Sequence, residues 1–227
     1  MGDPPMTPGS DHSAAVAAED GDSQKGRKRP KPGERRVQIL QSLAGMLEKP
    51  GSERVTTAAL AAALQVSEAA LYRHFASKAQ MFEGLIEFIE QSIFTLANQI
   101  AEREQSVAGS DMHTGARQAA KIVTMVIQFA EKNPGMARVM VGDALVLEHA
   151  RLQQRINQLF DRLESMLKQC LRVAPGVTAQ DAPTAHAQLR AAVLSAFLSG
   201  RLQRFVRSGF RRLPSESLDA SLSILLG

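Results

Sequence analysis

Three adjacent side chains that can donate hydrogen bonds to phosphate stand about a third of the way along the chain. Tyr72, Arg73 and His74 carry a phenol, a guanidinium and an imidazole, and Ala69 and Ala70 precede them. Such donors bind the phosphate oxygens of nucleic acids, and small alanine side chains let a helix approach the edges of the bases. The group therefore predicts a surface that contacts duplex DNA. The alternative is that Tyr72 and His74 only pack against a preceding helix.

Two short helices with a tight connection are expected to position these donors. Residues 56–64 read TTAALAAAL, residues 67–75 read SEAALYRHF, and residues 65–66 join them. Each segment begins with a hydroxyl side chain, Thr56 or Ser67, that can cap a helix by accepting a backbone hydrogen bond. Two short helices joined in this way indicate a helix-turn-helix, whose second helix enters the major groove.

Further contacts to the duplex are expected where helices begin. Thr57 and Lys78 stand at helix N-termini, where backbone N–H groups and the helix dipole favour phosphate. The bases are expected to be read near the start of the second helix, by Ser67, Glu68 or Ala69. The predicted DNA-contacting residues of this segment are Thr56, Thr57, Ser67, Glu68, Ala69, Tyr72, Arg73, His74 and Lys78.

A basic run precedes the helical part of the chain. Residues 1–33 are rich in Gly, Pro, Ser, Asp and Ala and lack an amphipathic period, which predicts a disordered arm. Near its end stand five cations, Lys25, Arg27, Lys28, Arg29 and Lys31. A solvated charge run is one interpretation. Because the run adjoins a helix-turn-helix, we favour contact of Arg27, Lys28 and Arg29 with phosphate or the minor groove.

From Glu34 onward, apolar residues recur every three or four positions, as in amphipathic helices. The first helix has the apolar face Val37, Leu40, Leu43, Ala44 and Leu47. A long fourth helix, capped by Ser77, has the stripe Phe82, Leu85, Ile86, Ile89, Ile93, Leu96 and Ile100. Later helices are expected at 112–132, 136–148, 150–172, 184–208 and 215–226. The sequence thus predicts an all-α fold, with a DNA-binding domain at 34–79 and a helical dimerisation and partner-binding domain at 80–227.

Composition agrees with a globular protein that binds nucleic acid. The 227 residues are 44% hydrophobic, with a formal net charge of +4. A lone cysteine, Cys170, excludes an intrachain disulfide and indicates a reducing compartment. No stretch approaches the roughly 18 apolar residues of a membrane span, and no secretory signal is evident. We therefore expect a soluble cytoplasmic protein.

Catalytic and metal-binding patterns are absent from the sequence. The histidines are scattered, at His12, His74, His113, His149 and His186. No pair of them has the spacing of ligands on one helix face, and no phosphate-binding glycine loop or nucleophile motif is present. We therefore expect no enzymatic activity, no metal and no cofactor.

The helix expected at 184–208 has a broad apolar face suited to a homodimer. Small residues, Ser195, Ser199 and Gly200, would allow close approach of a second helix. One helix-turn-helix reads few base pairs, so two copies usually bind a palindromic site. An ordinary core helix is the alternative. The predicted dimer interface consists of Val193, Leu194, Phe197, Leu198, Leu202 and Phe205.

The helix-turn-helix, with Ser77 and Lys78 directly after it, resembles the DNA-binding end of a TetR-type regulator. Further segments resemble the bacterial nucleoid occlusion factors, a TetR-like family, over about residues 34–212. These segments are ILQSLAGMLE at 39–48, LIEFIE at 85–90, EKNPG at 131–135, RINQLF at 155–160 and RFVRSGF at 204–210. Two positions depart from the family: Gln65 stands where glycine is common in the turn, and Leu96 where a basic residue is expected.

The resemblance implies a second partner and a function. Family members bind chromosomal DNA and restrain assembly of the tubulin-like division protein FtsZ, through a surface on the fourth and fifth helices. Carried over to this chain, that surface contains Phe88, Met125, Lys132 and Asn133. DNA would act by changing the dimer's conformation or by arraying dimers side by side. The alternative function is a ligand-responsive TetR-type repressor, with a small molecule held among the central helices.

Overall fold

The computed structural model describes residues 33–49, 55–108, 112–172 and 183–227, and within these ranges it contains helices and no strands. The all-α prediction is therefore confirmed. The elements are α1 (Glu34–Leu47), α2 (Thr57–Ala63), α3 (Glu68–Tyr72), α4 (Lys78–Ala108), α5 (Met112–Lys132), α6 (Pro134–Met140), the 3₁₀ turn η1 (Asp143–Leu145), α7 (Ala150–Leu171), α8 (Pro183–Arg207) and α9 (Leu218–Leu226).

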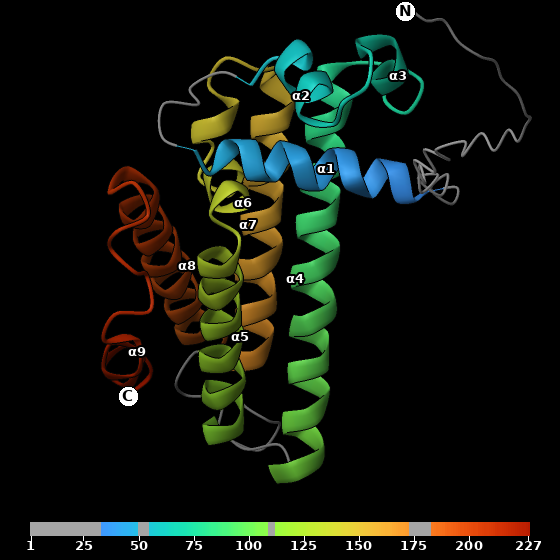
Figure 1. The fold of residues 1–227 in the computed structure, drawn as a ribbon. Helices are drawn as coiled ribbons and strands as arrows, with labels where there is room; N and C mark the ends of the chain where they lie inside the picture. The colour runs from blue at the N-terminus through green and yellow to red at the C-terminus, as the bar shows by residue number, and fades with distance from the viewer. Residues whose placement is uncertain (1–32, 50–54, 109–111, 173–182) are drawn as a thin grey trace, which may run out of the picture.

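The long helices form a body that carries the short ones at one end (Figure 1). Helix α4 packs against α5 and α7, and α7 packs against α8. Helix α1 lies across the upper part of this body, and α2 and α3 lie above it (Figure 1). Helix α9 packs against α5 and α8. We call α1–α3 the head and α4–α9 the body.

Side-chain caps fix where the short helices of the head and the long α4 begin. The hydroxyls of Thr56 and Ser67 accept hydrogen bonds from the third backbone N–H that follows them, at 3.2 Å each. Ser77 accepts in the same way from the N–H of Gln80, at 3.1 Å. All three caps predicted from the sequence are confirmed.

The predicted apolar faces of α1 and α4 are correct except at one position each. Val37 is 46% exposed and Leu96 is 41% exposed, whereas Ile39 and Ala97 are buried in their helices. Neither Val37 nor Leu96 reaches the core, because each lies at the edge of its helix's apolar stripe. Among the described residues, no helix is long and apolar enough to cross a membrane.

The segment after α5 is shorter and more broken than predicted. Helix α6 begins at Pro134, which suits the first helical turn, and ends at Met140. Gly142 then adopts a left-handed conformation, with φ 78°, before η1. A left-handed residue interrupts a right-handed helix, so the continuous helix expected at 136–148 is wrong. Likewise, Ser217 has φ 51°, and α9 begins only at Leu218.

Helix α6 joins the head to the body by a very close contact with α1. A Cβ atom on Gly135 would lie 2.0 Å from the carbonyl oxygen of Ala44, so only glycine fits at this crossing. The guanidinium of Arg138 donates a hydrogen bond to the carbonyl of Leu47 at 3.2 Å. The orientation of the head on the body therefore depends directly on α6.

Candidate nucleic-acid interface

The turn between α2 and α3 has the backbone geometry of a helix-turn-helix. Gln65 adopts φ 54°, in the left-handed region that favours glycine. The N–H groups of Gln65 and Val66 donate to the carbonyls of Ala62 and Ala61, each at 3.0 Å. A side chain in this conformation costs about 1 kcal/mol. The turn expected from the sequence is thus present, with its strained residue.

Packing decides which face of α3 is exposed. Leu71 and Phe75 are each 1% exposed and point into the core. Ala69 and Arg73 are exposed, and Tyr72 is 44% exposed. Within the part of the chain that the structure describes, the side chains of Tyr72 and Arg73 make no hydrogen bond or ion pair. These two predicted contact residues are therefore presented to solvent, whereas His74 is half-buried.

A residue of α1 that the sequence did not single out holds the end of α3. The guanidinium of Arg36 donates to the carbonyl of His74 at 2.7 Å, across 38 residues of chain. It also lies over the ring of Phe75, with its central carbon 4.2 Å from the ring centroid. Arg36 thus fixes the recognition helix against the rest of the head. No local pattern in the sequence signals a contact between residues so far apart.

Two of the predicted DNA-contacting residues bind each other. The hydroxyl of Thr57 donates to a carboxylate oxygen of Glu68 at 2.5 Å. Glu68 also lies in the first turn of α3, where the helix dipole favours a negative charge. This hydrogen bond links the N-termini of α2 and α3 and so fixes the relative orientation of the two helices.

Lys78, at the start of α4, forms an ion pair with Glu148, which lies just before α7. Two more ion pairs continue along the same side of α4: Arg151 binds Glu83 at 2.6 Å, and Arg155 binds Glu90 at 2.9 Å. The hydrogen bond to Glu90 raises the pKa of Arg155, against the opposing effect of burial. In this structure the charge of Lys78 is therefore offset by Glu148. The basic arm with Arg27, Lys28 and Arg29 lies outside the described residues.

The residues carried over as a second partner surface lie on α4, on α5 and at the start of α6. Phe88 is 42% exposed, Lys132 is exposed and Met125 is half-buried. Asn133 is engaged internally, because its amide donates to the carbonyl of Phe129 at 2.8 Å and closes the end of α5. The exposed part of the surface is thus an aromatic ring, a thioether and a cation.

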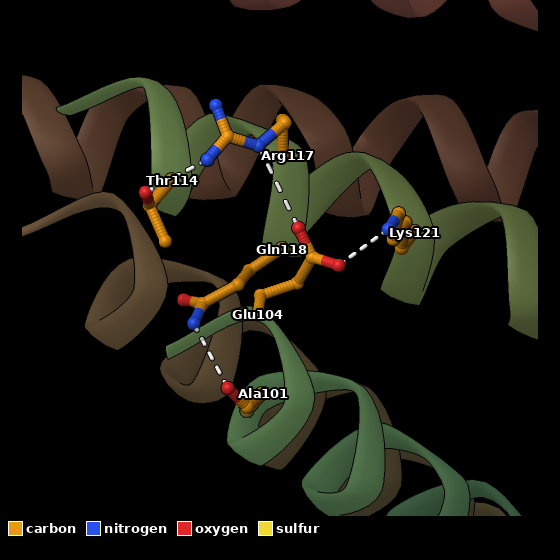
Figure 2. Close-up of polar contacts among 6 residues, drawn as sticks. All are labelled: Ala101, Glu104, Thr114, Arg117, Gln118 and Lys121. Atoms are coloured by element: carbon orange, nitrogen blue, oxygen red, sulfur yellow. Dashed lines mark hydrogen bonds and ion pairs between the residues drawn. The ribbon is translucent and has the colours of Figure 1, made fainter. Parts of the chain in front are cut away.

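Met125 also lines a shallow groove of about 890 Å³ that crosses α5 between α4 and α9. Its wall includes the apolar side chains Ile100, Leu222 and Leu226. Arg117 and Lys121 stand at its rim, where both bind the carboxylate of Glu104 (Figure 2).

The rim of this groove is held by a polar network between α4 and α5 (Figure 2). Gln118 is almost fully buried, and its amide donates to the carbonyl of Ala101 at 3.0 Å. The hydrogen bond from Lys121 lowers the pKa of Glu104, with a smaller contribution from Arg117. The two rim cations thus share a single ionised carboxylate.

The structure corrects most of the predicted dimer interface. Four of its residues are 2% exposed or less and face the protomer's own core: Leu194, Leu198, Leu202 and Phe205. They cannot contact a second copy, so the prediction is wrong for them. Val193 is 41% exposed, Leu189 is 64% exposed, and Phe197 is half-buried beneath Arg201. Helix α8 is apolar on two sides, and the sequence alone does not indicate which side faces inward.

A short helix-turn-helix mounted on an all-helical body defines a DNA-binding regulator of the TetR type. The family model for bacterial regulatory proteins of the tetR family matches residues 39–85. A SlmA-like model, described as a tetracyclin repressor-like C-terminal domain, matches residues 114–226. Both family models thus describe parts of tetracycline-repressor-like proteins, one at the N-terminal end and one at the C-terminal end.

Proteins named nucleoid occlusion factor SlmA are similar along most of the chain. The one from Idiomarina loihiensis is 46% identical over 84% of this chain and 93% of its own length. The one from Salmonella typhi is 49% identical over 82% of this chain and 90% of its own. The chain therefore belongs to the SlmA family of TetR-like DNA-binding proteins.

Solved structures with the same fold are more distant in sequence. The TetR family regulator PfmR from Thermus thermophilus has a TM-score of 0.61 and 21% identity, covering 83% of this chain and 96% of its own. The regulator FadR from Bacillus subtilis, in complex with stearoyl-CoA, has a TM-score of 0.59 and 13% identity, covering 84% and 97%. These similarities show the TetR-like fold.

Proposed function

We propose that this protein binds specific palindromic sites on the chromosome as a homodimer and, when bound, binds FtsZ and inhibits septum assembly over the nucleoid. The observation that carries the proposal is the identity of 46–49% to proteins named nucleoid occlusion factor SlmA, which covers head and body together. Such coverage favours a shared role over a shared DNA-binding domain alone.

The head supports binding of a duplex through the exposed face of α3. Ala69 is small and exposed at the start of this helix, and Tyr72 and Arg73 are exposed at its end. In a major groove, the start of the helix would meet base edges while the phenol and guanidinium donate to phosphates. Thr57 and Glu68 are hydrogen-bonded to each other, so they orient α3 in addition to lying near the proposed DNA surface.

The partner surface supports binding of a segment that is both apolar and acidic. Phe88 offers an exposed aromatic ring and Lys132 an exposed cation, with Met125 on α5. Aromatic and methionine side chains are enriched at the centres of protein interfaces, and charges surround them. Asn133 contributes by closing α5 rather than by direct contact.

A single helix connects the two proposed binding surfaces. Lys78 begins α4 and Phe88 lies ten residues further along it, which is a separation of about 15 Å at the usual rise of a helix. Any coupling between the two partners must be reciprocal, so FtsZ would strengthen DNA binding by the same factor as DNA strengthens FtsZ binding. Both a conformational change in the dimer and an array of dimers satisfy this condition.

The function is tested by measuring FtsZ polymer by sedimentation, with GTP, in the presence of the protein and fragmented genomic DNA. We expect the protein and DNA together to reduce the pelleted FtsZ more than either does alone. The variants Phe88→Ala and Lys132→Glu should keep DNA binding and lose inhibition. Ile224→Ala is the matched control, because Ile224 is an 83% exposed apolar residue on α9.

A genome-wide map of binding sites separates this function from the alternative. Many sites spread over the chromosome would support nucleoid occlusion. Unchanged FtsZ polymer, together with a few sites confined to promoters, would instead identify a ligand-responsive repressor and contradict the proposal.

A further inference from the structure

Five arginines gather at the C-terminal end of α8 and directly after it. They are Arg201, Arg204, Arg207, Arg211 and Arg212, here called the arginine patch. All except the half-buried Arg201 are exposed. Among the described residues none of the five forms an ion pair, and the hydrogen bonds of their side chains go to neutral oxygens.

Several arginines elsewhere in the body are paired with carboxylates. Arg117, Arg138, Arg151 and Arg155 each bind a carboxylate within 4 Å. In the arginine patch, by contrast, like charges stand close together without such partners, which raises the local positive potential and attracts anions. The patch is therefore a candidate binding surface for an anionic partner.

The patch contains a preformed pocket. Arg201, Arg204 and Arg212 line a hollow of about 280 Å³, together with Leu213, Pro214, Glu216 and Ser217. Arg201 is held in place, because its guanidinium donates to the carbonyl of Glu216 at 2.6 Å and to the hydroxyl of Ser221 at 2.8 Å. A fixed guanidinium beside two exposed ones suits the oxygens of a phosphate, which arginine can bind with two parallel hydrogen bonds.

The patch lies at the same end of the body as the head. Arg207 shares a groove with residues 141–143, directly after α6, and α6 packs against α1. The backbone N–H of Ser215 donates to Glu131, near the end of α5, at 2.9 Å. The upper end of α8 reaches the level of α1 (Figure 1).

A homodimer through α8 would double this charge. Arg204 lies eleven residues after Val193, a spacing that puts both residues on the same helix face, and both are exposed. If the exposed face around Leu189 and Val193 pairs with its copy, the two arginine patches approach each other on the side of the heads. A single extended polyanion could then neutralise both.

We propose that the arginine patch binds the phosphate backbone of duplex DNA, as a contact surface additional to the helix-turn-helix. This inference rests on the DNA binding proposed above. DNA fits better than an acidic protein, because protein interfaces need an apolar centre and, in the part of the chain that the structure describes, Leu213 is the one large apolar side chain exposed beside the arginines. The contact reads no base and adds affinity on any sequence.

The test is the salt dependence of DNA affinity for Arg204→Gln/Arg212→Gln, with Arg207→Gln/Arg211→Gln as a second variant. The probe is a duplex of random sequence, about 40 bp long, titrated between about 50 and 200 mM KCl, a range in which phosphate contacts dominate affinity.

Each lost phosphate contact reduces the slope of log Kd against log salt concentration by about 0.9. We expect a loss of about two to four units of slope per dimer, so that the variant binds more weakly than wild type and the difference is greatest at the lowest salt concentration. The matched control is Arg172→Gln, an exposed arginine just after α7, which should leave the slope unchanged.

Three results would overturn the inference. One is an unchanged slope in both double variants while Arg73→Ala weakens binding. Another is an unchanged DNA slope accompanied by lost binding of polyglutamate, which would assign the patch to an acidic protein. The third is sedimentation of the variants as monomers, which would assign the arginines to the dimer interface. A wild-type protein that binds no duplex at all would instead defeat the proposed function itself.

Discussion

Four arginines of the body, Arg117, Arg138, Arg151 and Arg155, are bound by carboxylates, whereas Arg73 on the head and the arginine patch on α8 are not. Arg151 and Arg155 lie against α4 and bind Glu83 and Glu90. Arg73 is equally cationic, yet it faces solvent at the end of α3. The formal net charge of +4 is the same whichever cations are paired. The comparison teaches that the position and the partners of the cations, rather than their number, indicate a candidate surface for nucleic acid.

The largest effect is expected from reversing an unpaired charge. Arg73→Glu should weaken binding to a specific site by more than about a hundred-fold, because each dimer loses two phosphate contacts and gains two repelling charges. Fluorescence anisotropy with a labelled site from the genomic map measures this. Arg172→Glu, a charge reversal at another exposed arginine just after α7, should change affinity less than about two-fold. Equal losses in both variants would show that total charge, not position, governs binding.

A smaller effect is expected at Lys78. This lysine is paired with a carboxylate, as several body arginines are, and it is also predicted to bind phosphate. Glu148→Gln removes its carboxylate partner, so the ammonium becomes available to DNA and a repelling charge is lost. We expect affinity to rise about three-fold, a size typical of exposed or half-exposed ion pairs. Glu164→Gln, which removes a carboxylate that accepts from Gln188 on α8, is the control. Unchanged or weaker binding by Glu148→Gln would remove Lys78 from the DNA-contacting set.

The smallest effect is expected at Glu104, whose two cationic partners are exposed. Hydrogen bonding from Lys121 lowers its pKa below the ordinary 4.5 in the folded protein. A lowered folded pKa stabilises the protein above the unfolded pKa, and this stabilisation is lost as the pH falls through the folded pKa. Glu104→Gln should therefore lower the urea midpoint slightly at neutral pH, and the difference should shrink and vanish as the pH is lowered through the folded pKa. A difference that persists in acid would show that packing, rather than charge, is responsible.

Local features of the fold were predictable from the sequence. Thr56, Ser67 and Ser77 cap their helices as expected, because capping depends on residues three positions apart. Gln65 adopts the left-handed turn that two short, closely connected helices require. The bounds of α5 agree with the prediction of about 112–132, and the breaker Asn133-Pro134-Gly135 accounts for its C-terminal end.

Contacts between distant segments were not predictable. Tertiary packing brings together three pairs of residues that no sequence spacing predicts. They are Arg36 with His74, Thr57 with Glu68, and Lys78 with Glu148. The side of α8 that faces outward was missed for the same reason. Leu194 and Val193 are adjacent apolar residues, and only the position of α7 and α5 decides that Leu194 is buried.

The contact between Gly135 and Ala44 lies directly beside the proposed partner surface. Lys132, Asn133 and Gly135 follow one another within four positions, so the proposed partner surface ends where α6 touches α1. A partner bound to Lys132 would therefore contact the chain three residues before the point where α6 holds the head. If the proposed function holds, mechanical load between bound DNA and a bound division protein would therefore pass close to this contact.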